Sequence, residues 1–192
     1  MAILDDVPLA SGAVGGAVAY LLGYLATYAL TIRAIERSLL GRLADAVSGD
    51  PAGWKIVGWV FYNAHGVGTR LTLDVPLLGT QHSLANFVAD GTFSPVLYLV
   101  PVVALGAAGG AVAYRERVET GRETVLSGAS VLFGYLPLSV VGAVAFAIVA
   151  DGATGRPALA PAVGLAGVVY PLVIGVVGAV LGRLVADSTT VE

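Results

Sequence analysis

Four long stretches of the chain are mostly apolar and carry no charged residue. They run from 7 to 32, from 91 to 114, from 124 to 150 and from 157 to 182. An α-helix rises 1.5 Å per residue and needs about 20 apolar residues to cross about 30 Å of hydrocarbon. The pattern therefore predicts membrane-spanning helices at 8–32, 94–114, 124–150 and 161–182.

A fifth apolar segment, 54–69, is aromatic but shorter, and it contains Asn63 and His65. A segment of this length spans the membrane, lies at its surface, or enters and returns. Lysine and arginine are enriched in cytoplasmic loops, so their distribution bears on this choice. If 54–69 spans, eight basic residues lie on one side and only Arg70 and Arg156 on the other; if it does not, the split is six to four. The eight are Arg33, Arg37, Arg42, Lys55, Arg115, Arg117, Arg122 and Arg183.

The stronger bias favours five spans, with the N-terminus outside and the C-terminus in the cytoplasm, and four spans are the alternative. We therefore predict an all-α fold, a single polytopic transmembrane bundle over residues 1–192. An amphipathic stretch after Arg33 is expected to prolong the first helix beyond the membrane until Gly49-Asp50-Pro51 ends it. The segment 70–93 is then an outer loop.

The first predicted helix has two different faces. Gly12, Gly16, Tyr20, Tyr24 and Thr27 fall on one half of its circumference, and branched apolar residues fall on the other half. Small residues let helices approach closely in lipid, and hydroxyl groups hydrogen-bond across the contact. The first face is expected to point into the bundle, either as ordinary helix packing or as a hydroxyl-lined path for a solute.

Other pairs of glycines repeat the four-residue spacing that brings helices together. They are Gly106 with Gly110, and Gly178 with Gly182. Three internal prolines, Pro101, Pro137 and Pro171, each lie close to a tyrosine. Proline frees a carbonyl one turn earlier, which a neighbouring hydroxyl can satisfy. The kinks are either static or part of a hinged bundle around a cavity.

Asn63 and His65 are the polar side chains most deeply placed by the pattern. A polar residue at membrane depth is by default a candidate functional residue. The alternative is a structural role, in which its side chain is hydrogen-bonded to a nearby carbonyl. The two residues are two positions apart and point to nearly opposite sides of a helix. Tyr20, Tyr24 and Thr27 are candidate partners for His65, and all five residues form the predicted intramembrane polar site.

Composition excludes several classes of protein. Hydrophobic residues make up 57% and charged residues 12% of the chain, whereas soluble domains carry about 25% charged residues. Without cysteine there is no disulfide or thiolate metal site, and Asp74, His82 and Asp90 match no metal-binding spacing. The charge-free spans lack the carboxylates of an intramembrane aspartyl protease, and no glycine-rich phosphate loop occurs. We expect no enzyme, no cofactor, no metal and no nucleic-acid partner.

Five short motifs resemble a family of small, uncharacterised haloarchaeal membrane proteins. They are GWVFYNAH (Gly58–His65), LYLVP (Leu97–Pro101), AVAYR (Ala111–Arg115), LFGYLPLSVVGA (Leu132–Ala143) and VVYPLVIG (Val168–Gly175). Members of that group are sometimes labelled transporters, and no functional residues come with the resemblance. The resemblance implies an archaeal source, and a single lysine beside nine arginines independently suggests a salt-adapted one.

Two classes of function remain open. The prolines, glycines and hydroxyl face favour a small-solute or ion transporter or a pore subunit, which at this size would need a homo-oligomer. The alternative is a non-transporting structural or interaction subunit that binds an unknown membrane partner. Either protein would be a multi-pass protein of the cell membrane, with the lipid bilayer as its surroundings. A polar cavity at mid-membrane would favour transport, and a solid core would favour the alternative.

Overall fold

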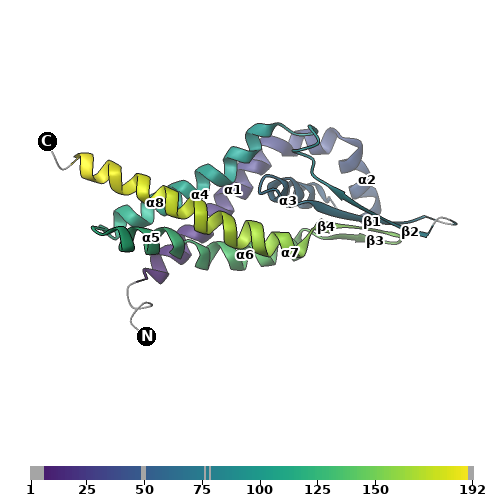
Figure 1. Ribbon diagram of the computed structural model, residues 1–192. Coiled ribbons are helices and arrows are strands. Elements are labelled where there is room, and N and C mark those ends of the chain that lie inside the picture. The colour runs from purple at the N-terminus through teal and green to yellow at the C-terminus, as the bar shows by residue number, and fades with distance from the viewer. Residues whose placement is uncertain (1–6, 49–50, 76, 78, 190–192) are drawn as a thin grey trace.

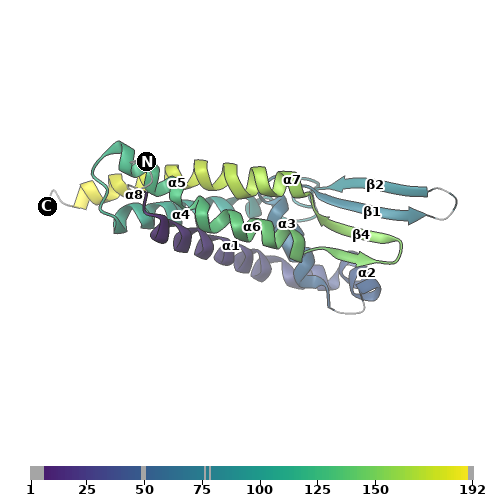
Figure 2. The ribbon, with the colours of Figure 1, turned by 90° about the horizontal axis from the view of Figure 1, so that it is seen from below.

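The computed structural model describes residues 7–48, 51–75, 77 and 79–189 (Figure 1). In this part of the chain, four helical segments are long and apolar enough to cross a membrane, and they lie together as a bundle (Figures 1 and 2). They are Leu9–Arg37, Pro95–Arg115, Gly121–Ala145 and Leu159–Ala186. Each corresponds to one of the four longer predicted spans.

Only the first of these segments is one continuous α-helix, α1 (Leu9–Arg37). The second joins the 3₁₀ turn η1 (Pro95–Tyr98) to α4 (Leu99–Arg115). The third joins α5 (Gly121–Ser130) to α6 (Leu132–Ala145). The fourth consists of α7 (Leu159–Pro161), the π-helical η2 (Ala162–Val169) and α8 (Tyr170–Thr189).

The three prolines expected to kink helices lie at or near these changes of helix type. Pro101 is the third residue of α4, Pro137 lies inside α6, and Pro171 is the second residue of α8. Proline cannot donate a backbone hydrogen bond, and its ring crowds the carbonyl of the preceding turn. A regular α-helical ladder is therefore interrupted close to each of them.

The predicted fifth span at 54–69 is not one of the four long helices. Its helix, α3 (Gly53–Asn63), covers 11 residues, or about 16 Å, which is about half the hydrocarbon thickness. The chain then turns and continues as a strand at Thr69. In addition, the start of α1 and the end of α8 lie at the same end of the bundle (Figures 1 and 2).

α3 enters the bundle from the end opposite the termini. The side chain of Lys55, near its start, donates to the carbonyl of Ala147 at 3.0 Å. Trp59 donates to the Phe146 carbonyl at 2.7 Å, and Tyr62 reaches the Ser139 carbonyl. As the residue number in α3 rises from 55 to 62, the number of the bonded residue falls from 147 to 139. α3 therefore runs antiparallel to α6 and extends toward the centre of the bundle. All residues from 56 to 65 are buried.

A four-stranded antiparallel sheet corrects the all-α prediction. Its strand order is β2-β1-β4-β3, and it extends from the end of the bundle where α3 enters (Figure 2). The strands are β1 (Thr69–Val75), β2 (Gly79–Ala85), β3 (Ile148–Ala150) and β4 (Ala153–Pro157). Part of the predicted outer loop 70–93 thus forms β1 and β2, and the predicted span 124–150 ends at Ala145. The amphipathic stretch after α1 becomes a separate helix, α2 (Leu39–Ser48).

The glycines expected at helix contacts lie where helix backbones approach one another. A Cβ atom added at Gly16 would overlap the carbonyl of Val131, and one at Gly12 would overlap Ser130. On the other side of the bundle, an added Cβ at Gly178 would overlap the carbonyl of Gly106. In the same way, a Cβ atom added at Gly182 would lie 2.8 Å from the Cα atom of Gly110. The α1–α5/α6 and α4–α8 contacts therefore depend on residues without side chains.

Gly16→Leu should destabilise the protein much more than Val18→Leu. The new side chain at Gly16 would push α1 away from Val131, at a cost of at least about 1–3 kcal/mol. Val18 is 46% exposed, so its variant is a matched control of the same final residue. Thermal unfolding in detergent measures the difference, and equal melting temperatures would contradict the packing assignment.

Candidate functional site

His65 lies at the inner end of α3, fully buried, with both ring nitrogens hydrogen-bonded. Its Nδ1 is 2.8 Å from the Phe61 carbonyl, and its Nε2 is 2.7 Å from the Tyr135 hydroxyl. A carbonyl only accepts, so Nδ1 carries the proton. In the neutral ring Nε2 must then accept from Tyr135. The histidine thus joins the end of α3 to the first turn of α6.

A second set of hydrogen bonds connects four helical elements beside His65, namely α1, α3, α6 and η2. The Tyr62 hydroxyl donates to the Ser139 carbonyl, and the Tyr20 hydroxyl lies 3.2 Å from that of Tyr62. Because Tyr62 has one proton, Tyr20 is the donor between the two tyrosines. The Ser139 hydroxyl donates at 3.0 Å to the carbonyl of Ala162, the first residue of η2. Gly142 leaves the space that the two tyrosine hydroxyls occupy.

The inner end of α3 has its backbone carbonyls capped from within the protein. Gly66 has a φ of +74°, and the amide of Val67 reaches back to the Tyr62 carbonyl at 3.0 Å. This is the pattern of a Schellman C-cap, in which glycine takes the left-handed position. The Asn63 carbonyl accepts from the amide of Gly66 at 2.9 Å. Together with His65, which binds the Phe61 carbonyl, these contacts satisfy the end of a helix that lies away from water.

The side chain of Asn63 fixes the turn that follows α3. Its amide donates to the Val67 carbonyl at 2.8 Å and to the Thr69 hydroxyl at 3.2 Å. Its oxygen accepts from the backbone amide of Phe87 at 2.9 Å. Asn63 therefore joins α3, the start of β1 and the segment after β2. Its side-chain partners differ from those of His65, in keeping with the expected opposite directions of the two residues.

The predicted hydroxyl partners divide between different places. Tyr20 joins the Tyr62 pair, and its ring centre lies 5.2 Å from that of Tyr135. The Tyr24 hydroxyl instead donates to the Trp54 carbonyl at 3.0 Å. Thr27 donates to the Gly23 carbonyl of its own helix at 2.9 Å. His65 is therefore bound by Phe61 and Tyr135 and by none of these three residues.

Sequence reasoning misses three residues of this buried cluster: Tyr62, Tyr135 as a histidine partner, and Ser139. Tyr62 is one of several aromatic residues of the segment 54–69, and only the antiparallel packing of α3 on α6 brings it to Ser139. The proximity of Tyr135 to Pro137 is a useful signal, although it assigns no partner. In the described residues, every buried side-chain nitrogen or oxygen has a hydrogen-bond partner. We call the hydrogen-bonded set Tyr20, Tyr62, His65, Tyr135 and Ser139 the central polar cluster.

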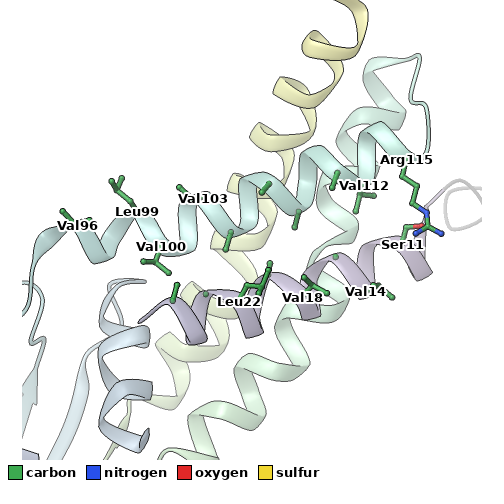
Figure 3. Close-up of a pocket in the computed structure, with 18 residues that line it drawn as sticks. Ser11, Val14, Val18, Leu22, Val96, Leu99, Val100, Val103, Val112 and Arg115 are labelled. Carbon is green, nitrogen blue, oxygen red and sulfur yellow. The ribbon is translucent and has the colours of Figure 1, made fainter. Parts of the chain in front are cut away.

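A separate apolar groove lies between α1 and α4 on the outside of the bundle (Figure 3). Its volume is about 710 Å³, and Val18, Leu22 and Val103 are among its lining residues. One end of the groove is polar, where Ser11 and Arg115 line it (Figure 3). The lining of the groove includes no residue of the central polar cluster, so the two features are structurally independent.

A smaller, more polar cavity of about 420 Å³ adjoins the same end of the bundle. Arg115 lines both this cavity and the groove, and Arg117, Arg183 and Glu119 line the cavity only. The neighbouring Glu116 accepts a hydrogen bond from the Ser11 hydroxyl. Basic side chains therefore gather where the apolar surface ends.

A family model matches residues 3–186, which is nearly the whole chain. The chain belongs to DUF7978, a family of unknown function. No curated protein and no solved structure matches it. Membership in DUF7978 agrees with the resemblance to uncharacterised proteins. The DUF7978 match carries no information about a haloarchaeal source or a transport activity.

The match to DUF7978 covers both the central polar cluster and the groove, but it assigns no role to either. Among the described residues, no group of three or more His, Asp or Glu could hold a metal ion. His82 lies on β2, where its Nδ1 is 3.2 Å from the Thr72 hydroxyl, and Asp74 accepts from Thr80. These side chains take part in cross-strand contacts of the sheet.

His65→Leu should lower the stability of the protein by about 2–4 kcal/mol. Leucine leaves the Phe61 carbonyl and the Tyr135 hydroxyl buried without partners, at about 1–3 kcal/mol each. His65→Gln keeps one donor and one acceptor and should be milder, and His82→Leu on the exposed strand β2 should change little. The measurement is chemical or thermal unfolding in detergent.

The double variant His65→Leu with Tyr135→Phe separates the contribution of the His65–Tyr135 hydrogen bond from that of side-chain packing. Removing both partners of one hydrogen bond should cost less than the sum of the two single changes. Strictly additive losses, or a His65→Leu protein as stable as the wild type, would show that the pair does not hold α3 in place.

Proposed function

We propose that this protein is a non-transporting structural or interaction subunit of a membrane complex. The observation that carries the proposal is that every polar side-chain group of the central polar cluster is already hydrogen-bonded within the protein. Its hydroxyl and imidazole groups are bonded to one another and to backbone carbonyls, and no buried side-chain polar atom of the described residues lacks a partner. A solute pathway needs polar groups that exchange their partners for the solute or for water.

Aromatic packing around the cluster supports the same proposal. The ring centres of Phe61 and His65 are 4.8 Å apart, and those of His65 and Tyr170 are 5.0 Å apart. Tyr20 and Phe61 meet edge to face at 5.1 Å. Side chains therefore fill the volume at the inner end of α3, and the 710 Å³ groove lies outside it.

The sheet and α2 supply a surface for a partner at one end of the bundle. β2 is exposed along its length except at its last residue, and Leu73, Leu84 and Val149 of the sheet are more than half exposed. Exposed apolar side chains on a projecting sheet are consistent with contact to another protein or to the membrane surface. This surface is the reason to prefer an interaction role over a purely structural one.

Within this proposal the protein crosses the cell membrane four times, and α3 is a re-entrant helix. Four spans leave both termini on one side, with Arg115, Arg117, Arg122 and Arg183. The other side holds the remaining six basic residues, Arg33, Arg37, Arg42, Lys55, Arg70 and Arg156. Because basic residues favour the cytoplasm, the sheet end is cytoplasmic and both termini are outside. The haloarchaeal source implied by the resemblance also stays a proposal.

A transporter or pore subunit is the second candidate, and a specific observation favours it. η2 is a π-helix of 8 residues that begins at the carbonyl bound by Ser139. π-helical turns occur often at functional sites, and half-length helices that end at mid-membrane form the ion and substrate sites of several transporters. A chain of this size would then work as a homo-oligomer.

Cysteine accessibility distinguishes the two candidates, because the chain has no native cysteine. Ser139→Cys places a thiol in the central polar cluster, and Ser83→Cys places one on the exposed strand β2. In membrane fragments that are open to solvent on both sides, a maleimide should label the Ser83→Cys variant and leave the Ser139→Cys variant unlabelled until the protein is denatured. Rapid labelling of the folded Ser139→Cys protein would reveal a water-filled path and would favour transport.

Reporter fusions test the topology separately. Tags placed near Asp5 and after Glu192 should both be outside, and the thiol of the Ser83→Cys variant should react only from the cytoplasmic side. The reason is that the start of α1 and the end of α8 lie at the same end of the bundle (Figure 2). Termini on opposite sides of the membrane would contradict four spans.

A further inference from the structure

The groove between α1 and α4 has the dimensions and position of a site for one hydrocarbon chain. Along α1 it extends from Ser11 to Ala26, which is about 22 Å of helix. This length exceeds the ~15 Å of hydrocarbon in one leaflet. Its volume of about 710 Å³ lies in the range of pockets that hold small lipophilic ligands, about 300–1,000 Å³.

The lining of the groove has apolar walls on both helices. Val14, Val18 and Leu22 come from α1 and are 46–62% exposed, and Leu99 and Val103 come from α4 and are 58% and 67% exposed. A small residue, Ala107, lies at an exposed position between these walls and leaves the middle of the groove open. A flexible acyl chain fits such a groove without the need for a hydrogen-bond partner.

Arg115 closes the groove at one end, and its guanidinium group makes no hydrogen bond or ion pair with the part of the chain that the structure describes (Figure 3). Tyr114 beside it is 70% exposed, as is typical of aromatic residues at the level of lipid headgroups. Glu116, the nearest acid in sequence, is bound by Ser11. A planar guanidinium group at this depth is well suited to bind a phosphate group through two parallel hydrogen bonds.

We propose that this groove binds one phospholipid, with an acyl chain between α1 and α4 and the phosphate on Arg115. The adjoining cavity, lined by Arg117 and Arg183, accommodates the rest of the headgroup. A second copy of the chain is a worse occupant. A two-fold contact through this face would bring the Arg115 side chains of both copies to the same membrane level and oppose like charges. The inference does not depend on whether the protein transports a solute.

Native mass spectrometry of the full chain in detergent tests the proposal with two probes. Phosphatidylglycerol and diacylglycerol with the same acyl chains differ only in the anionic phosphoglycerol headgroup. The wild type should bind one phosphatidylglycerol about tenfold more tightly than diacylglycerol, which corresponds to about 1.4 kcal/mol. Arg115→Gln should remove this difference, and Arg37→Gln, at the opposite end of α1, should preserve it.

Filling the groove tests the position of the acyl chain. Ala107→Phe should weaken binding of both probes at least tenfold, and Ala111→Phe serves the same purpose if the first variant does not fold. Ala145→Phe changes an exposed alanine on α6 and is the matched control, with binding unchanged. Unaltered lipid binding in the groove variants would overturn the proposal. So would a phosphatidylglycerol preference that survives Arg115→Gln, or a dimer that dissociates in Ala107→Phe with lipid binding intact.

Discussion

A helix that ends inside an apolar bundle must satisfy its last carbonyl groups without water, and the rest of this structure depends on that constraint. α3 stops at Asn63, well away from the end of the bundle at which it enters. The carbonyls of Phe61, Tyr62 and Asn63 are bound by His65, by the turn at Gly66 and by the amides that follow. Each unpaired group in such a place would cost several kcal/mol. His65 and Asn63, which the sequence marks as functional candidates, therefore stabilise the buried end of α3 and the turn that follows it.

The same capping contacts organise the elements around α3. His65 reaches α6 through Tyr135, and Asn63 joins the start of β1 to the segment that leads to α4. Tyr20 and Tyr62 connect α1 to α6, and Ser139 continues the link to η2. Two of the four long apolar segments are thus hydrogen-bonded to the short helix α3 and the turn that follows it, and a third is bonded to them through Ser139. Close helix packing at glycines adds further contacts, including the one between α4 and α8.

The four long helices could be predicted from the sequence because charge-free apolar length is sufficient evidence for them. The apolar segment 54–69 also predicts a short helix where α3 lies, but its sequence leaves open whether that helix spans the membrane or turns back, and the basic residues favour five spans over four. The hairpin of β3 and β4 does leave a signal. Asp151-Gly152 is a two-residue turn between paired Ala150 and Ala153, but it follows directly on an apolar run that favours a helix.

Hydrogen–deuterium exchange of the protein in lipid nanodiscs tests the central claim, that the inner end of α3 is a dry and permanently capped structure. The amides of His65 and Val67, which bind the Tyr62 carbonyl, should exchange only with global unfolding. Amides of the exposed edge strand β2 should exchange much faster. Exchange at His65 and Val67 within seconds, at the rate of β2, would mean that water reaches the centre of the bundle and would contradict this account.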